Sequence, residues 1–273
     1  MGKSGEGINM RVYATPQFWW RAVIVACGLS GLLMNETRIV YYTSQSNLIT
    51  LGFFVGALYW MLKRGTTAAP APRLRGAVTL WILITCLISH FMLSHGANPL
   101  PGLADPDPTA ATVNRSLFLV HYVVPLMVLL DWVFFGPHRQ VRWADIALWI
   151  LFPLGYGLVI EFRAVLVPEA PVQYPYFFLD PTAHGYGWVV GQFVRLAVIF
   201  AVLGAVVVGL DRLASLAGRP RRDRGRGGDA FADASASSSG SDGASSGASA
   251  SASAGAGPVE SGSGLSEGAL RQG

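Results

Sequence analysis

Six stretches of the chain consist mainly of apolar residues, and the polar residues are concentrated between them. These stretches cover residues 18–34, 46–62, 77–95, 116–135, 143–161 and 188–210. A helix needs roughly 20 mostly apolar residues, with a range of about 17–25, to cross the hydrocarbon core of a bilayer. The pattern therefore predicts an all-α, polytopic membrane protein with six transmembrane helices. Trp19 and Trp20 favour a retained first helix with an interfacial anchor over a cleaved signal peptide.

The composition agrees with this pattern. Apolar residues make up 52% of the chain and charged residues only 13%, and the mean hydropathy is +0.42. A soluble domain carries about twice that share of charge. The composition therefore excludes an ordinary soluble protein.

The charges between the stretches alternate along the chain. Lys63, Arg64 and Arg73 follow the second stretch, Arg139 and Arg142 the fourth, and a run of arginines the sixth, whereas the other loops carry mainly Asp and Glu. Cytoplasmic loops of membrane proteins are enriched in Lys and Arg. We therefore expect a multi-pass protein of the cell membrane, with residues 1–17 as a cytoplasmic N-terminus, 18–212 as the transmembrane domain, and a cytoplasmic C-terminus.

Residues 213–273 change in composition. A basic run, "GRPRRDRGRGG", leads into a long segment of Ser, Ala and Gly. Such a segment has too little apolar surface to offset the entropy of ordering, so we expect a disordered cytoplasmic tail. The basic run is typical of a positive stop signal after the last helix, so the basic pI of about 9.3 implies no nucleic-acid partner.

Motifs for metals and phosphates are absent from the sequence. There is no CxxC, no zinc spacing, no GxGxxG and no P-loop, and we expect no metal and no cofactor. Cys27 and Cys86 both fall inside predicted helices, where free, buried thiols are expected.

Polar residues inside or beside the helices are therefore the candidates for a functional site, because such residues are costly in hydrocarbon. The densest run is "YYTSQSNLIT" at 41–50. His90 and His121 each lie five residues from the outer end of a predicted helix, about 7.5 Å deep. Polar groups from several helices are expected at this level, in the outer third of the bilayer: Thr43, Asn47, His90, His121, Tyr122, Asp180 and Arg195.

Some of these polar residues also have a structural explanation. Hydroxyls such as those of Ser44, Ser46 and Thr50 commonly bond to a carbonyl one turn earlier or join neighbouring helices. Arg195 more often pairs with a carboxylate than with a substrate. Arg21 and Asp131 lie near inner helix ends, where side chains can reach water, and we assign them no role.

Three segments resemble a known family. "YYTSQSNLIT", "HYVVPLMVLLDW" and "YPYFFLDP" are similar to motifs of the androgen-induced membrane hydrolase family, and more closely to its bacterial Pr6Pr-type integral membrane relatives. The resemblance covers roughly residues 15–212. Characterised animal members hydrolyse fatty acid esters of hydroxy fatty acids with an intramembrane Thr and a His. The resemblance implies that Thr43 and His121 hold these roles.

The first hypothesis is therefore a threonine-dependent hydrolase of lipid esters, with membrane lipids or lipid esters as partners and the acyl chain left in the lipid. Thr43 would attack, His121 would accept its proton, and Asn47, Tyr122 or backbone amides would stabilise the oxyanion. His90, Asp180 and Arg195 are further candidates for substrate binding. A small transporter or lipid-binding protein without catalysis is the second hypothesis. The third is a b-type haem protein ligated by His90 and His121.

Overall fold

A computed structural model describes residues 11–34 and 38–217, and these residues form helices, turns and loops without a β-strand. The predicted tail from 218 onwards and residues 1–10 lie outside the described residues. The helices are α2 (Pro16–Leu33), α3 (Tyr42–Arg64), α4 (Pro72–Leu87), α5 (Pro108–Phe118), α6 (Val124–Phe134), α7 (Asp145–Leu166) and α8 (Gly185–Ala217). Helix α8 thus extends to Ala217, past residue 213, where we expected the tail to begin.

Two helices are continued by π-helical turns. The turn η1 (Ile88–Leu93) extends α4, and η3 (Leu119–Val123) joins α5 to α6 in one continuous segment. Short 3₁₀ turns, η2 (Pro101–Ala104) and η4 (Phe177–Leu179), lie in the loops before α5 and α8. π-turns are rare and often occur at functional sites. The histidines of interest, His90 and His121, lie in η1 and η3.

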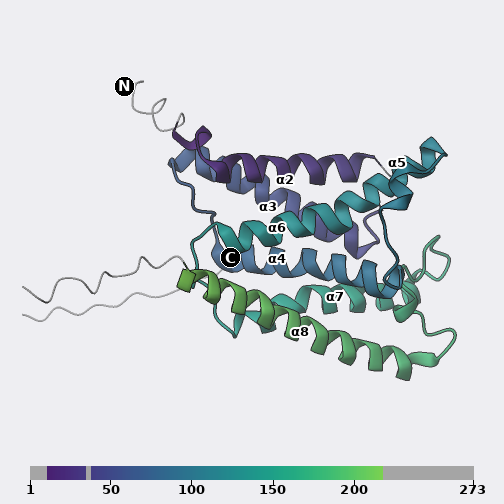
Figure 1. Cartoon of the computed structure of the whole chain (residues 1–273). Helices are drawn as coiled ribbons and strands as arrows, with labels where there is room; N and C mark the ends of the chain where they lie inside the picture. Colours follow the sequence, from purple (N-terminus) through teal and green to yellow (C-terminus); the bar gives the residue numbers. More distant parts are fainter. Residues whose placement is uncertain (1–10, 35–37, 218–273) are drawn as a thin grey trace, which may run out of the picture. The chain divides into compact units, whose positions relative to one another are not determined.

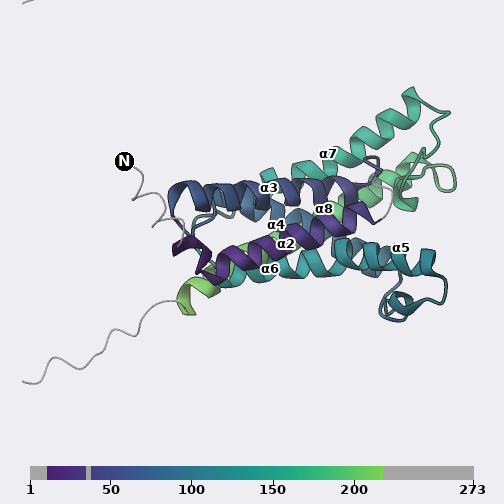
Figure 2. The ribbon, with the colours of Figure 1, turned by 90° about the horizontal axis from the view of Figure 1, so that it is seen from above.

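The helices run up and down in one bundle (Figures 1 and 2). Helix α4 packs against α3, α6, α7 and α8, while α2 packs against α3 and α6. Helix α3 begins at one end of the bundle, here called the Thr43 end, where η1, η3 and the start of α8 also lie. Helices α2 and α7 begin, and α8 ends, at the opposite end, here called the Arg21 end (Figure 1).

Five helical segments are long and apolar enough to cross a membrane: Tyr42–Arg64, Pro72–Leu93, Pro108–Phe134, Asp145–Leu166 and Gly185–Leu216. They correspond to the second to sixth predicted stretches. The first stretch corresponds to α2, an 18-residue helix that carries Gln17 and Arg21 in its first turns. The multi-pass, membrane-embedded character of the chain is thus supported, whereas a sixth span stays a prediction.

The outer faces of the helices are apolar. On α8, Val190, Val194, Val198 and Val202 form one stripe at helical spacing, and each is about 60% exposed. On α7, Leu148, Leu151, Leu158 and Phe162 form a similar exposed face. Soluble proteins rarely expose such continuous apolar surface. These faces are compatible with contact to lipid, as expected of an integral membrane protein.

A buried ionic cluster lies at the Arg21 end. Arg21 Nε contacts one carboxylate oxygen of Asp131 at 3.0 Å, and Arg75 Nη2 contacts the other at 2.7 Å. All three side chains are at most 2% exposed. We expected Arg21 and Asp131 to reach water, and this was wrong because they neutralise one another inside the bundle. The cluster joins α2, α4 and α6.

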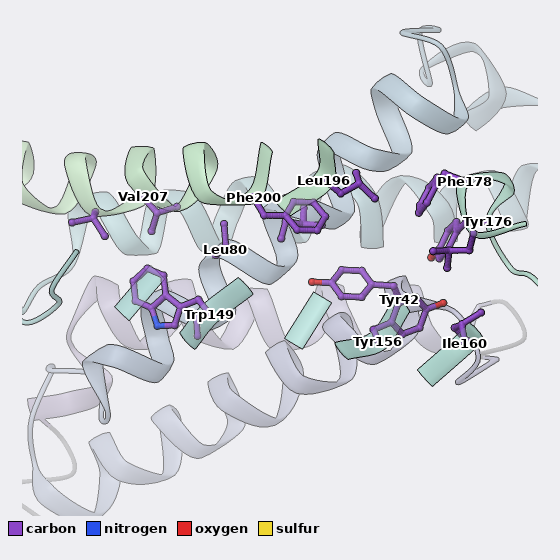
Figure 3. Packing of buried hydrophobic residues seen from close by; sticks show 14 of the residues in the cluster. Tyr42, Leu80, Trp149, Tyr156, Ile160, Tyr176, Phe178, Leu196, Phe200 and Val207 are labelled. Atoms are coloured by element: carbon purple, nitrogen blue, oxygen red, sulfur yellow. The ribbon is translucent and has the colours of Figure 1, made fainter. Parts of the chain in front are cut away.

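The largest apolar cluster fills the space between α3, α4, α7 and α8. Figure 3 shows Leu196 and Phe200 of α8 facing Tyr42 of α3. Pro153 lies inside α7, and because proline has no N–H it cannot donate a hydrogen bond to the carbonyl of Trp149. That carbonyl accepts a 2.7 Å hydrogen bond from the Trp81 indole of α4 instead. The proline is thus accommodated without an unpaired carbonyl.

Candidate functional site

Thr43 and His121 lie in contact at the Thr43 end of the bundle. Thr43 Oγ1 is 3.2 Å from His121 Nε2, although the residues are 78 positions apart in the chain. His121 is only 8% exposed, while Thr43 is half-buried. Thr43 lies in the first turn of α3, because this helix begins at Tyr42, four residues before the predicted stretch. A hydroxyl beside an imidazole is the arrangement that activates a weak nucleophile.

The other nitrogen of His121 is also engaged. Nδ1 lies 2.9 Å from the carbonyl oxygen of Leu117, one turn earlier in the same helix. A carbonyl can only accept, so Nδ1 carries the proton and Nε2 of the neutral ring is free to accept from Thr43. The sequence offered no third group that would orient His121. The Leu117 carbonyl supplies that orientation from the backbone.

Asn47 joins the two helices that carry Thr43 and His121. Its Nδ2 donates to the Thr43 carbonyl at 2.9 Å and to the Val120 carbonyl of η3 at 3.3 Å. Both donors of the amide are therefore used in this structure, and Oδ1 is buried without a partner. Asn47 thus positions the pair, while we had considered it as an oxyanion donor.

Helix α2 also packs closely against η3. A Cβ on Gly31 would lie 2.7 Å from Val120 Cγ1 and 3.1 Å from Leu119 Cβ, which is too close for a larger residue. Ser116 donates a 2.6 Å hydrogen bond to the Gly31 carbonyl at the same crossing. The close approach at Gly31 therefore helps to fix the position of η3 and His121.

Tyr176, in the loop between α7 and α8, completes this group. Its hydroxyl lies near the Thr43 side chain and near the backbone amides of Tyr42 and Thr43. The first amides of a helix have no acceptor within the helix. Burial raises the pKa of the Tyr176 phenol, while these polar neighbours act in the opposite direction. The Tyr176 hydroxyl and the first amides of α3 thus lie on the Thr43 side of the pair.

Two cavities meet at Thr43. A polar cavity of about 400 Å³ is lined by residues that include Ser44, Ser116 and His121. An apolar cavity of about 40 Å³ lies between α3, α4, α7 and α8. Both cavities are lined by Thr43, Leu93 and Tyr176, which lie between them. Ligand sites commonly have about 300–1,000 Å³, so the polar cavity is large enough for a small molecule.

His90 lies apart from the pair. Its Nδ1 is 3.2 Å from the Tyr122 hydroxyl, and the two rings contact edge to face. His121 in turn is engaged by Thr43 and Leu117. Each histidine therefore has its own hydrogen-bond partner. Among residues 11–34 and 38–217, no group of three or more His, Cys, Asp or Glu could hold a metal ion.

The last two predicted site residues lie elsewhere. Asp180 accepts from the Thr182 amide in the loop before α8. It neighbours Tyr174, whose pKa rises to about 12 because of desolvation, a hydrogen bond with Tyr186 and the nearby carboxylates. Arg195 is exposed on α8, without a hydrogen bond or ion pair in the described part of the chain. The structure therefore brings together Thr43, His121 and Asn47, and leaves Asp180 and Arg195 outside.

Ser46 and Thr50 have the structural roles expected of them, whereas Ser44 lines the polar cavity. Ser46 contacts Thr85 of α4 at 2.7 Å and donates to the Thr43 carbonyl. Thr50 donates to the Ser46 carbonyl one turn earlier in the same helix. The Ser46 hydroxyl thus joins α3 to α4, and neither Ser46 nor Thr50 lines the polar cavity.

Cys27 and Cys86 are free thiols, half-buried in their helices.

Comparisons with known proteins add no relative. No protein-family model, curated protein or solved structure matches this chain.

Proposed function

We propose that the chain is an integral membrane hydrolase of lipid esters, with Thr43 as nucleophile and His121 as general base. The contact of 3.2 Å between Thr43 Oγ1 and His121 Nε2 carries this proposal. The Leu117 carbonyl supports it, because it favours the tautomer in which Nε2 accepts a proton. The motif resemblance to the androgen-induced membrane hydrolases points to the same two residues.

The reaction follows from the positions of these groups. As Thr43 Oγ1 bonds to the ester carbon, its proton passes to His121 Nε2. The carbon–oxygen bond to the alcohol then breaks, and the imidazolium returns the proton to the departing oxygen. Water, deprotonated by His121, attacks the acyl-threonine, which releases the acid and restores Thr43. The Tyr176 hydroxyl and the first amides of α3 are the nearest donors for the oxyanion.

The site is proposed to face the outer leaflet of the cell membrane. Lys63 and Arg64, at the end of α3, and the loop with Arg139 and Arg142 lie at the Arg21 end of the bundle. Asp180 lies in the loop before α8, at the Thr43 end. Cytoplasmic loops are enriched in Lys and Arg. We infer that the Arg21 end is cytoplasmic and that both chain termini are on that side.

The decisive experiment uses purified full-length protein in detergent, with a fluorophosphonate probe and 4-nitrophenyl octanoate. We expect the probe to label Thr43 and the ester to be cleaved. Thr43→Ala should abolish labelling, Thr43→Ser should retain part of it, and His121→Ala should lower kcat by about 10²–10⁴-fold. His90→Ala is the matched control, because His90 contacts Tyr122 and not Thr43. A folded Thr43→Ala variant that hydrolyses at the parental rate would contradict the proposal.

The second candidate is a binding or transport protein without catalysis. The polar cavity of about 400 Å³ and the π-helical turns η1 and η3 favour it. Such turns often occur at functional sites, which include ligand-binding sites. Under this alternative, the purified protein binds ligands in the polar cavity, while Thr43 takes no label and no ester is cleaved.

A further inference from the structure

We infer that the apolar cavity beside Thr43 binds a single unbranched acyl chain, so that the acyl half of the ester lies inside the bundle. This inference rests on the proposed function. It differs from the expectation that the acyl chain stays in the surrounding lipid, and it defines the substrate class as esters of linear acids.

The position of the cavity is the first argument. Thr43 lines both cavities, so an ester carbonyl placed at Thr43 Oγ1 has one substituent on each side. The side that contains His121 and Ser116 is polar and offers access for water and the alcohol half. The other side consists mainly of Leu, Ile and Phe side chains. Of the two cavities, the apolar one therefore offers the better match for the hydrocarbon half of an ester.

The shape of the cavity is the second argument. Its volume of about 40 Å³ is small, yet its walls come from α3, α4, η1, α7, η4 and α8. At about 10–15 Å³ for each water-sized group, it has room for about three such groups. So small a cavity has room for the first carbons of a linear chain, whereas a ring or a branch beside the carbonyl is too large for it. Longer chains must displace side chains or pass out between the helices.

Close packing sets one wall of the cavity. At Gly157 of α7, an added Cβ would lie 2.7 Å from the Phe193 ring of α8. Leu196 and Phe200, further along α8, face Tyr42 across the cleft (Figure 3). Leu196 is 6% exposed, whereas Val194 on the same helix is 62% exposed. The two positions therefore separate an effect inside the cavity from an effect at the lipid-facing surface.

The test compares 4-nitrophenyl acetate, butyrate, octanoate and cyclohexanecarboxylate as substrates of the full-length protein. The parent should cleave the linear esters and reject the cyclohexane ester by at least about tenfold in kcat/KM. Leu196→Trp should lower kcat/KM for the octanoate at least about tenfold relative to the acetate. Phe200→Ala should shift the preference toward longer chains. Val194→Trp, the matched control, should leave the profile of the parent unchanged. Equal effects of Leu196→Trp on acetate and octanoate would overturn the inference.

A second measurement does not depend on hydrolysis. A diazirine-bearing palmitic acid, photolysed with the protein, should form adducts on Leu196, Phe200 or Ile84 inside the cavity. Adducts confined to Val194, Val198 and similar outward-facing residues would overturn the inference. Adducts inside the cavity without any ester cleavage would support the binding of an acyl chain there and contradict the proposed hydrolase activity. If Leu196→Trp cleaves esters with the same chain-length profile as the parent, the hydrolase activity is supported and the inference that the cavity binds the acyl chain is contradicted.

Discussion

Arg21 and Asp131 form an ion pair of 3.0 Å in which neither side chain is more than 1% exposed. Asp131 also bonds to Arg75, so one carboxylate compensates two guanidinium groups. Removing one partner of a buried pair leaves the other charge without compensation. Asp131 of α6 thus joins α2 and α4 electrostatically through Arg21 and Arg75.

We therefore predict that Asp131→Ala is strongly destabilising, by about 3–5 kcal/mol, because two buried cations lose their counter-ion. Thermal unfolding of the purified protein in detergent measures this loss. Glu169→Ala is the matched control, since Glu169 is exposed in the loop after α7 and surface changes are usually within about 0.5 kcal/mol. Equal unfolding temperatures for the two variants would show that the cluster does not stabilise the bundle.

Gly31 provides a second prediction, on packing. A methyl group there would lie 2.7 Å from Val120, so Gly31→Ala should push α2 away from η3 and cost about 1–3 kcal/mol. Gly56→Ala on α3 is the matched control, because nothing lies within 4 Å of its added Cβ. Alanine favours a helix over glycine by about 1 kcal/mol, so this control should be neutral or stabilising. Unfolding temperatures of the two variants should thus move in opposite directions or by clearly different amounts.

The helices could be predicted from the sequence more readily than the site. Stretches of apolar residues located the five long spans to within several residues. The start of α5 at Pro108 was missed, although Asp107 before a proline is a recognisable helix cap, and its side chain accepts from Thr109 and Ala110. The cap lies in a polar stretch, and hydropathy alone does not detect a helix that begins outside the apolar segment.

The contacts of the site depend on features that a hydropathy pattern does not contain. The π-turn at 119–123 and the close approach at Gly31 determine where His121 lies. Tyr176 reaches Thr43 from a loop between α7 and α8; it lies in the segment "YPYFFLDP", but nothing in that segment indicates a contact with Thr43. The orienting group for His121 is a backbone carbonyl, which every residue has. Thr43, His121 and Asn47 were named as candidates from the sequence, whereas Gly31, Leu117 and Tyr176, which lie beside them, were not.

Asn47 is predicted to be a positioning residue. Asn47→Ala removes the hydrogen bond to the Val120 carbonyl, which joins α3 to η3, and the bond to the Thr43 carbonyl within α3. It should slow the labelling of Thr43 by a fluorophosphonate about tenfold or more. Thr50→Ala on the next turn is the matched control, because its hydroxyl bonds only to the Ser46 carbonyl of its own helix. Labelling rates are compared at a temperature where both variants remain folded. Equal labelling rates in Asn47→Ala and the parent would remove Asn47 from the site.

Membrane orientation gives a fourth prediction. A reporter that is active only in the cytoplasm should be active when it is fused after Gly65, and silent when it is inserted near Gly102. The reason is that Lys63, Arg64 and Arg73 lie around the connection between α3 and α4, whereas residues 96–107 contain no Lys or Arg. Activity at Gly102 with silence at Gly65 would invert the bundle and place Thr43 on the cytoplasmic side.

The pH dependence of stability tests the environment of Tyr176. Burial raises the pKa of this phenol in the folded protein above its ordinary value of about 10. The folded state thus keeps a proton that the unfolded state loses, so the contribution to stability is complete below pH about 10 and falls as the pH rises further. Unfolding temperatures measured from pH 8 to 11.5 should therefore decline less steeply above pH 10 in Tyr176→Phe than in the parent. Tyr59→Phe, at an exposed position of α3, should follow the parent. Identical slopes for Tyr176→Phe and the parent would mean that the phenol at Thr43 is accessible to solvent, and a solvated hydroxyl would be a weak donor to an oxyanion.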